Sequence, residues 1–203
     1  RGHDEYAGKY DPHVWMSPVL WQEVVLAVRD ALIRTDPDSA DVFDANAKRH
    51  LAEIGRLQDY ASQALSGVPE KERVLLTAHD AFGYFGDAYG FEVLGIQGIS
   101  TESEAGLNRI GELVDLLVER EISAVFVESS VSDRSIRAVI EGAQAQGHKI
   151  SVGGELFSDA MGEIGTYEGT YIGMIDHNVT VIASALGANV PARGMSGKLS
   201  AGF

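Results

Sequence analysis

The chain has 203 residues, of which 45% are hydrophobic, and it carries a formal net charge of −14 at pH 7. This length is enough for a sizeable core in one domain, or in one domain plus part of another. The negative charge argues against a nucleic-acid or anionic-membrane partner, because both need basic patches. The absence of cysteine excludes disulfides and thiolate metal sites, so any metal must take nitrogen and oxygen ligands.

The first third of the chain predicts a loop followed by two helices. Residues 1–10 are polar and show no periodicity. Ser17 and Pro18 suit a helix start, and this helix is expected to end near Arg34. A second, longer helix is expected from Ser39 to Ser66. At about 1.5 Å per residue it would span about 40 Å, longer than a small domain is wide, which favours a rigid connector between two lobes.

From Arg73 onward, short apolar strands alternate with helices. The alternation predicts an α/β fold, with a parallel four-stranded sheet flanked by helices. The closing stretch NVPARGMSGKLSAGF has no periodicity, and we expect a loosely held tail. The expected strands are 74–78, 91–96, 124–128 and 149–153, and the expected helices cover about 81–89, 103–121, 133–146 and 169–186.

These elements suggest three parts: residues 1–35 as the end of an amino-terminal lobe, 36–68 as a long connecting helix, and 69–203 as a carboxy-terminal α/β lobe. The chain begins at Arg1 in a polar stretch, and we expect it to be part of a longer protein. It has no run of about 18 apolar residues, so we expect no membrane-spanning helix.

Ionisable side chains collect where the predicted strands end. His79 follows the first strand, Glu128 closes the third, and Asp159 follows the fourth. Ligands of open α/β sheets bind outside the carboxyl ends of the strands. His13 comes from the earlier segment. Two imidazoles with carboxylates suit Zn²⁺, Mn²⁺ or Fe²⁺, but their spacing matches no compact metal motif, so ordinary buried or surface roles stay open.

Four blocks of the sequence resemble the zinc/manganese-binding solute-binding proteins of bacterial ABC importers, in their TroA-like branch. The blocks are DPHVW, RVLLTAHDAFGYFGDAYGFEVLGIQGIS, VFVESSV and GGELFSDAMGEIGTYEGTYIGMIDHN, and their order and separation agree over nearly the whole chain. The resemblance implies two α/β lobes joined by one long helix, with the metal between them. It also implies that His13, His79 and Asp159 are metal ligands. The first ligand of the family, a His of the amino-terminal lobe, has no counterpart here.

The resemblance also implies a function. The expected protein is an extracytoplasmic binding component that captures Zn²⁺ or Mn²⁺, with Fe²⁺ also compatible, and delivers it to a cognate ABC permease and ATPase. It would be a monomer without nucleic-acid partners, periplasmic or lipid-anchored through a preceding segment. Some family members are known as adhesins, which we take as a description of location. The alternative is a metallohydrolase, because a His/His/Asp set with an open position is also typical of catalytic zinc.

Glu128 matches no ligand position of the family. We interpret it as orienting a ligand imidazole, the alternative being a helix N-cap or a surface carboxylate. His3 resembles the end of a metal-attracting loop, although a plain solvated loop explains it as well. His50 and His148 are expected at the surface, and His177 is expected to be either exposed or packed.

Overall fold

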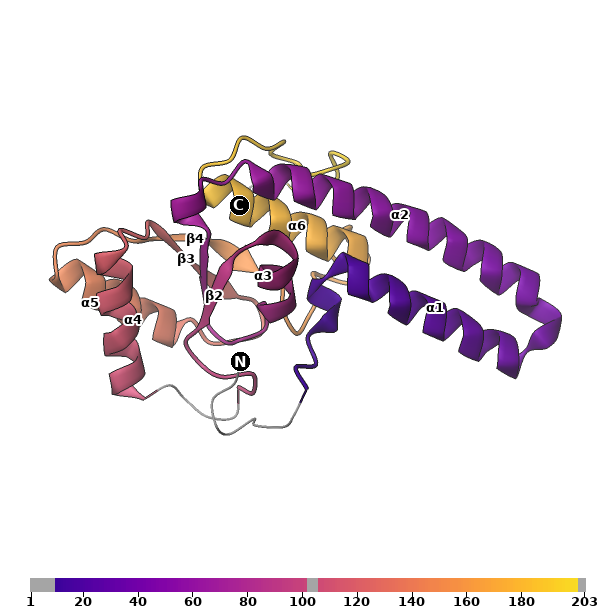
Figure 1. Cartoon of the computed structure of the whole chain (residues 1–203), viewed down its shortest axis with the longest axis horizontal. Coiled ribbons are helices and arrows are strands. Elements are labelled where there is room, and N and C mark those ends of the chain that lie inside the picture. The colour runs from indigo at the N-terminus through magenta and orange to yellow at the C-terminus, as the bar shows by residue number, and fades with distance from the viewer. Residues whose placement is uncertain (1–9, 102–105, 201–203) are drawn as a thin grey trace.

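The computed structural model describes residues 10–101 and 106–200, so His3 lies outside the described residues. An α/β body carries a long antiparallel helical hairpin that projects from it, formed by α1 (Pro18–Thr35) and α2 (Ala40–Ser66) (Figure 1). No helix in the described part of the chain combines the length and the apolarity needed to cross a membrane.

The hairpin forms as its end signals predict. The Ser17 hydroxyl accepts a hydrogen bond from the Leu20 backbone N–H at the start of α1, and Pro18 takes the first helical position. α2 has 27 residues and ends at Gly67. Its buried residues lie mainly in its second half, which packs against α6 (Tyr171–Ala185), whereas its first half pairs only with α1 (Figure 1). The first half of α2 and α1 therefore stand clear of the body.

The body contains four short strands, and both of its strand pairs are parallel. β1 (Val74–Thr77) pairs with β2 (Glu92–Gly95), and β3 (Ala124–Glu128) pairs with β4 (Ser151–Leu156). The parallel strands flanked by helices are as predicted. The expected single sheet, however, is divided into two sheets of two strands, with β1 lying beside β3 without a continuous ladder.

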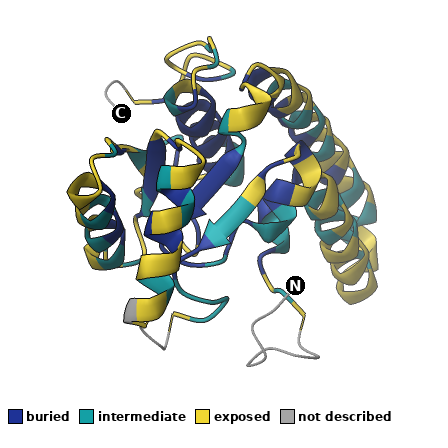
Figure 2. Ribbon diagram, turned by 60° about the vertical axis from the view of Figure 1, so that its left-hand side comes forward, coloured by how far each residue is buried: buried dark blue, intermediate teal, exposed yellow. Residues whose placement is uncertain are grey.

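Helices cover both faces of the strands, and successive strand residues point to opposite sides (Figure 2). Leu75 and Phe126 join one apolar cluster with α2, α3 and α6, whereas Leu76 and Val125 join the other with α4 and α5. The remaining helices and turns are α3 (Gly83–Tyr89), α4 (Leu107–Glu119), α5 (Arg134–Ala145) and the 3₁₀ turns Val14–Met16, Pro37–Ser39 and Glu70–Glu72.

The segment after α6 corrects one expectation. Residues 188–200 are not loosely held, because Leu199 is fully buried and two backbone N–H groups bond buried carboxylates. Met195 donates to Asp176 at 2.9 Å, and Ser200 donates to Glu168 at 2.6 Å. This segment lacks periodicity because it is built from turns, and side chains of other elements hold it in place.

Candidate metal site

His13 is fixed by the residues on either side of it. The Asp11 carboxylate accepts hydrogen bonds from the His13 backbone N–H, at 2.9 Å, and from its ring Nδ1, at 2.7 Å. Such a turn around an Asp side chain is a common use of that residue. On the other side, the Trp15 ring meets the His13 ring edge to face, with centroids 5.2 Å apart. The imidazole is buried, with Nε2 directed away from Asp11.

His79 lies two residues beyond the end of β1. Its backbone N–H donates to Glu128 Oε1 at 2.9 Å, and Glu128 Oε2 lies 2.7 Å from the ring Nδ1. The second contact is as short as a charge-assisted hydrogen bond but is not aligned with the ring N–H direction. Thr77 donates through its hydroxyl to the His79 carbonyl at 2.7 Å. Neither the His79 nor the Glu128 side chain has exposed surface.

Asp159 follows β4 on a loop that other elements hold at its base. The side chain of Asn178, on α6, bonds both the N–H and the C=O of Phe157, at 2.9 and 2.7 Å. The Trp15 indole N–H donates to the Ser158 carbonyl at 2.9 Å. The strand end and the segment carrying His13 thereby fix the residue just before Asp159, whose own side chain is 39% exposed.

The structure brings the three predicted residues together. Asp159 Oδ1 lies 3.5 Å from His13 Nε2, and its Oδ2 lies 3.4 Å from His79 Nε2. All three candidate ligand atoms lie within 4.8 Å of one another. A tetrahedral ion with bonds of about 2.0–2.2 Å separates its ligand atoms by roughly 3.3–3.6 Å. The two distances to Asp159 are therefore those of ligands around one small ion.

The His79 Nε2 atom gives a second sign of a missing ligand. It is buried, and it has no hydrogen-bond partner among the described residues. Buried polar atoms are normally paired, because an unpaired one costs about 1–3 kcal/mol. A metal ion placed between the three side chains would supply that partner.

The surrounding carboxylates shift the pKa values at the site. Burial by itself would lower the pKa of His79, but the Glu128 and Asp159 carboxylates outweigh it and raise this pKa above its ordinary value. Burial would likewise raise the pKa of Asp11, but its hydrogen bonds to His13 prevail and hold this pKa below its ordinary value. The site is thus built to hold positive charge.

The other histidines lie elsewhere. His50 is partly exposed on α2 beside Glu53, and the His148 ring lies 2.7 Å from the Ile122 carbonyl. His177 is buried rather than exposed, and its Nε2–H donates to the Glu155 carbonyl at 2.9 Å. Within residues 10–101 and 106–200, His13, His79 and Asp159 are the one group whose ligand atoms gather closely enough for a metal ion.

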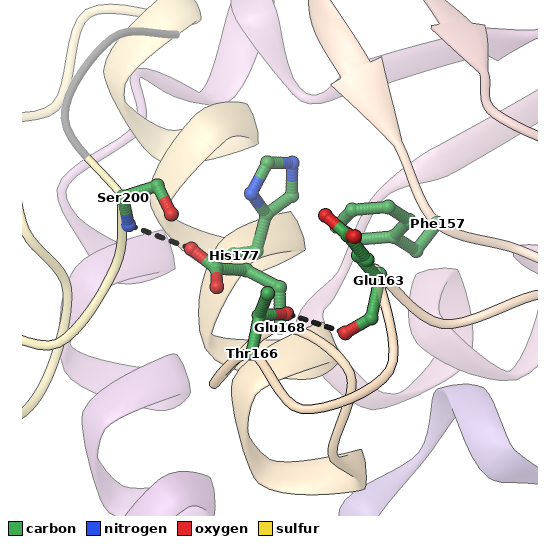
Figure 3. Close-up of a pocket in the computed structure, with 7 residues that line it drawn as sticks. Phe157, Glu163, Thr166, Glu168, His177 and Ser200 are labelled. Atoms are coloured by element: carbon green, nitrogen blue, oxygen red, sulfur yellow. Dashed lines mark hydrogen bonds between the residues drawn. The ribbon is translucent and has the colours of Figure 1, made fainter.

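A separate hollow of about 240 Å³ lies between α6 and the loop that follows Asp159 (Figure 3). The His177 and Phe157 rings pack together there with centroids 4.6 Å apart, and Glu168 on the opposite wall accepts from the Ser200 backbone (Figure 3). Burial lowers the pKa of His177. The hollow supports the loop from behind and is distinct from the cluster of three ligand residues.

Sequence reasoning did not assign the supporting roles of Asp11, Trp15 and Asn178. A signal for Asp11 is present in the Asp-Pro-His order, because an Asp two residues before a His can turn back onto it. The Trp15 indole and the Ser158 carbonyl are 143 residues apart in the chain, so no local pattern links them.

Two α/β-type features thus coincide: parallel strands covered by helices, and a nitrogen/oxygen donor set where those strands end. Together they define the class of metal-binding α/β proteins. The family described as "Zinc-uptake complex component A periplasmic" matches residues 1–185, and the chain belongs to this family.

Individual relatives agree with this assignment. The manganese-binding lipoprotein MntA of Bacillus subtilis is 52% identical over 177 residues, which cover 87% of this chain and 58% of that protein. The iron-binding protein YfeA of Yersinia pestis is 32% identical and covers 90% of this chain and 57% of its own length. The structure of the periplasmic zinc-binding protein TroA from Treponema pallidum is 42% identical, with a TM-score of 0.87 over 92% of this chain and 67% of that one. The chain thus spans less than three fifths of these curated relatives.

Proposed function

We propose that this chain belongs to an extracytoplasmic solute-binding protein that captures a divalent transition metal for an ABC importer. His13, His79 and Asp159 would be its ligands. The observation that carries the proposal is the placement of Asp159 oxygens 3.4 and 3.5 Å from two imidazole nitrogens, one of them buried and without a hydrogen-bond partner among the described residues.

The donor set suits more than one metal. Two imidazoles and one carboxylate favour Zn²⁺ over Mn²⁺ in raw affinity, so the metal carried would also depend on supply. Relatives are named for manganese, zinc and iron. We therefore propose Zn²⁺ or Mn²⁺ as cargo, with Fe²⁺ also accepted, and a cognate permease and ATPase as partners. The names of two relatives, a lipoprotein and a periplasmic protein, support a location outside the cytoplasm.

We further propose that the protein binds without catalysis. The relatives are named as binding proteins, and none of these names describes a reaction. The metallohydrolase alternative needs a coordination position left open for water, whereas a fourth ligand from another lobe would close the site. Retention of the bound metal without turnover of ester or peptide substrates is the expected behaviour.

Metal titration of the intact, chelator-treated protein tests the proposal. His13→Ala, His79→Ala and Asp159→Ala should each lower Zn²⁺ and Mn²⁺ affinity by more than about tenfold, because each removes a direct ligand. His148→Ala is the matched control, since this ring bonds a backbone carbonyl away from the site. Unchanged affinity in all three ligand variants would refute the site.

The division into lobes is also a proposal. An apolar groove of about 350 Å³ runs between α1 and the first half of α2, where Val28 is 52% exposed and Leu32 is 43% exposed. Exposed apolar surfaces of this kind usually mark contacts. Because the relatives are longer than this chain, we propose that an amino-terminal lobe covers the groove, with 36–68 as the connecting helix and 69–203 as the second lobe.

Thiol labelling of the intact protein tests this arrangement, since the chain itself has no cysteine. Val28→Cys should react slowly if a lobe covers it. Val152→Cys is the control, because Val152 is 49% exposed on β4 and should react rapidly. Equal rapid labelling at both positions would refute coverage of the groove.

A further inference from the structure

We propose that Glu128 is a positioning residue that determines the metal preference of the site. In this inference, which rests on the proposed function, Glu128 holds His79 as a ligand through Nε2 and prevents a carboxylate from replacing that imidazole. The role follows from three observations: both carboxylate oxygens contact one residue, the contact is closed to solvent, and the equivalent contact at His13 is built differently.

Glu128 contacts both the backbone and the ring of His79. It is the last residue of β3, and it reaches the segment after β1, 49 residues earlier in the chain. One oxygen accepts from the His79 backbone N–H at 2.9 Å, and the other lies 2.7 Å from Nδ1. Because two lone pairs at 2.7 Å would repel, Nδ1 carries the ring proton. The Nε2 lone pair then faces Asp159 and His13, as ligation requires.

The carboxylate behind His13 is less enclosed. Asp11 contacts His13 from two residues earlier in the chain, and its side chain is 23% exposed, so water can take over part of its role. The Glu128 side chain has no exposed surface. Loss of the Glu128 carboxylate should therefore affect metal binding more than loss of the Asp11 carboxylate.

The same enclosure limits which residue position 79 can hold. A Glu at this position would bring a second anion into a solvent-free space beside Glu128, where the imidazole now provides an N–H. Two carboxylates that share such a space resist joint ionisation. An oxygen-rich site, which suits Mn²⁺ better than Zn²⁺, is thereby blocked while Glu128 is charged. Glu128 thus keeps the site nitrogen-rich.

Glu128→Gln separates this role from simple packing, because Gln has nearly the same shape. If its amide oxygen accepts from the His79 backbone, its NH₂ group faces Nδ1 and favours the tautomer with the proton on Nε2. That tautomer cannot ligate through Nε2. In the intact protein we expect a 10–100-fold loss of zinc affinity, a change of His79 tautomer in NMR spectra of the metal-free form, and little change in its melting temperature. Asp11→Asn, the matched control, should lose less affinity.

A second pair of variants tests metal preference. His79→Glu alone should bind both Zn²⁺ and Mn²⁺ weakly, whereas His79→Glu with Glu128→Gln should recover manganese affinity at least tenfold while zinc affinity stays low. Affinities come from competition with a chromogenic chelator. Zinc binding and a His79 tautomer that are unchanged in Glu128→Gln would overturn the positioning role. Manganese binding by His79→Glu that the second substitution does not improve would overturn the preference role. If the unsubstituted protein binds neither metal, the proposed function itself fails.

Discussion

Trp15→Phe isolates one hydrogen bond that links the His13 segment to the Asp159 loop. The substitution keeps an aromatic ring beside His13 but removes the indole N–H that donates to the Ser158 carbonyl at 2.9 Å. Because Ser158 is buried, its carbonyl loses its partner in a site where water has little access. An unsatisfied buried acceptor costs about 1–3 kcal/mol. For a chain of this length, that lowers the melting temperature by roughly 2–12 °C.

The loss should also appear in metal affinity, because the bond fixes the residue directly before Asp159. Groups that orient metal ligands are typically worth about 10–100-fold in affinity, and we expect the lower end since Asn178 still holds the base of the loop. Thermal unfolding of the metal-free protein and zinc titration measure the two effects. Trp21→Phe is the matched control, because Trp21 stacks on Tyr171 from α1. A lowered melting temperature with unchanged zinc affinity would show that the bond supports the fold but does not place Asp159.

Three further predictions concern the unsubstituted intact protein. Zinc at a thousand times its Kd should stabilise the folded state by about 4 kcal/mol, or roughly 8–16 °C for about 200 residues and less for a longer chain; an unchanged melting curve would contradict the site. Because the pKa of His79 is raised, protons compete with metal at higher pH than for an ordinary imidazole, so affinity should already fall as pH drops toward 6.5, and calorimetry showing constant affinity from pH 8 to 5.5 would exclude imidazole ligation. Metal-induced changes in tryptophan fluorescence should disappear in Trp15→Phe and persist in Trp21→Phe, since the Trp15 ring contacts a ligand imidazole; the opposite pattern would move the metal away from His13.

The α/β elements could be predicted from sequence because each leaves a local signal. β3 was expected at 124–128 and lies at Ala124–Glu128, as a short apolar run between two helical patterns. The split between the two strand pairs could not be predicted, since hydrogen bonding between β1 and β3 depends on sub-ångström placement rather than on composition. β4 extends to Leu156, three residues beyond its expected end, because Gly153 and Gly154 obscure the strand pattern.

The candidate ligands could be found from strand ends and from the family resemblance, but their supports could not. His79 and Asp159 follow parallel strands, where a general rule expects ligands. The order of residues gives no sign that Asn178 holds the end of β4. Asp176 and Asn178 interrupt the apolar pattern of α6 and suggested an exposed face around His177. The structure buries both polar side chains because each satisfies the backbone of another segment.

The polar residues of α6 also bear on how the molecule is assembled as it is made. Asn178 secures the end of β4, Asp176 secures the following segment, and Thr180 hydrogen-bonds the Tyr60 hydroxyl of α2 at 2.8 Å. All three contacts come from a helix near the end of the described chain. A ribosome-bound chain that stops before α6 therefore holds His13 and His79 without a settled Asp159. Competence to trap an ion arises late in synthesis, when α6 joins the body, rather than step by step as each ligand emerges.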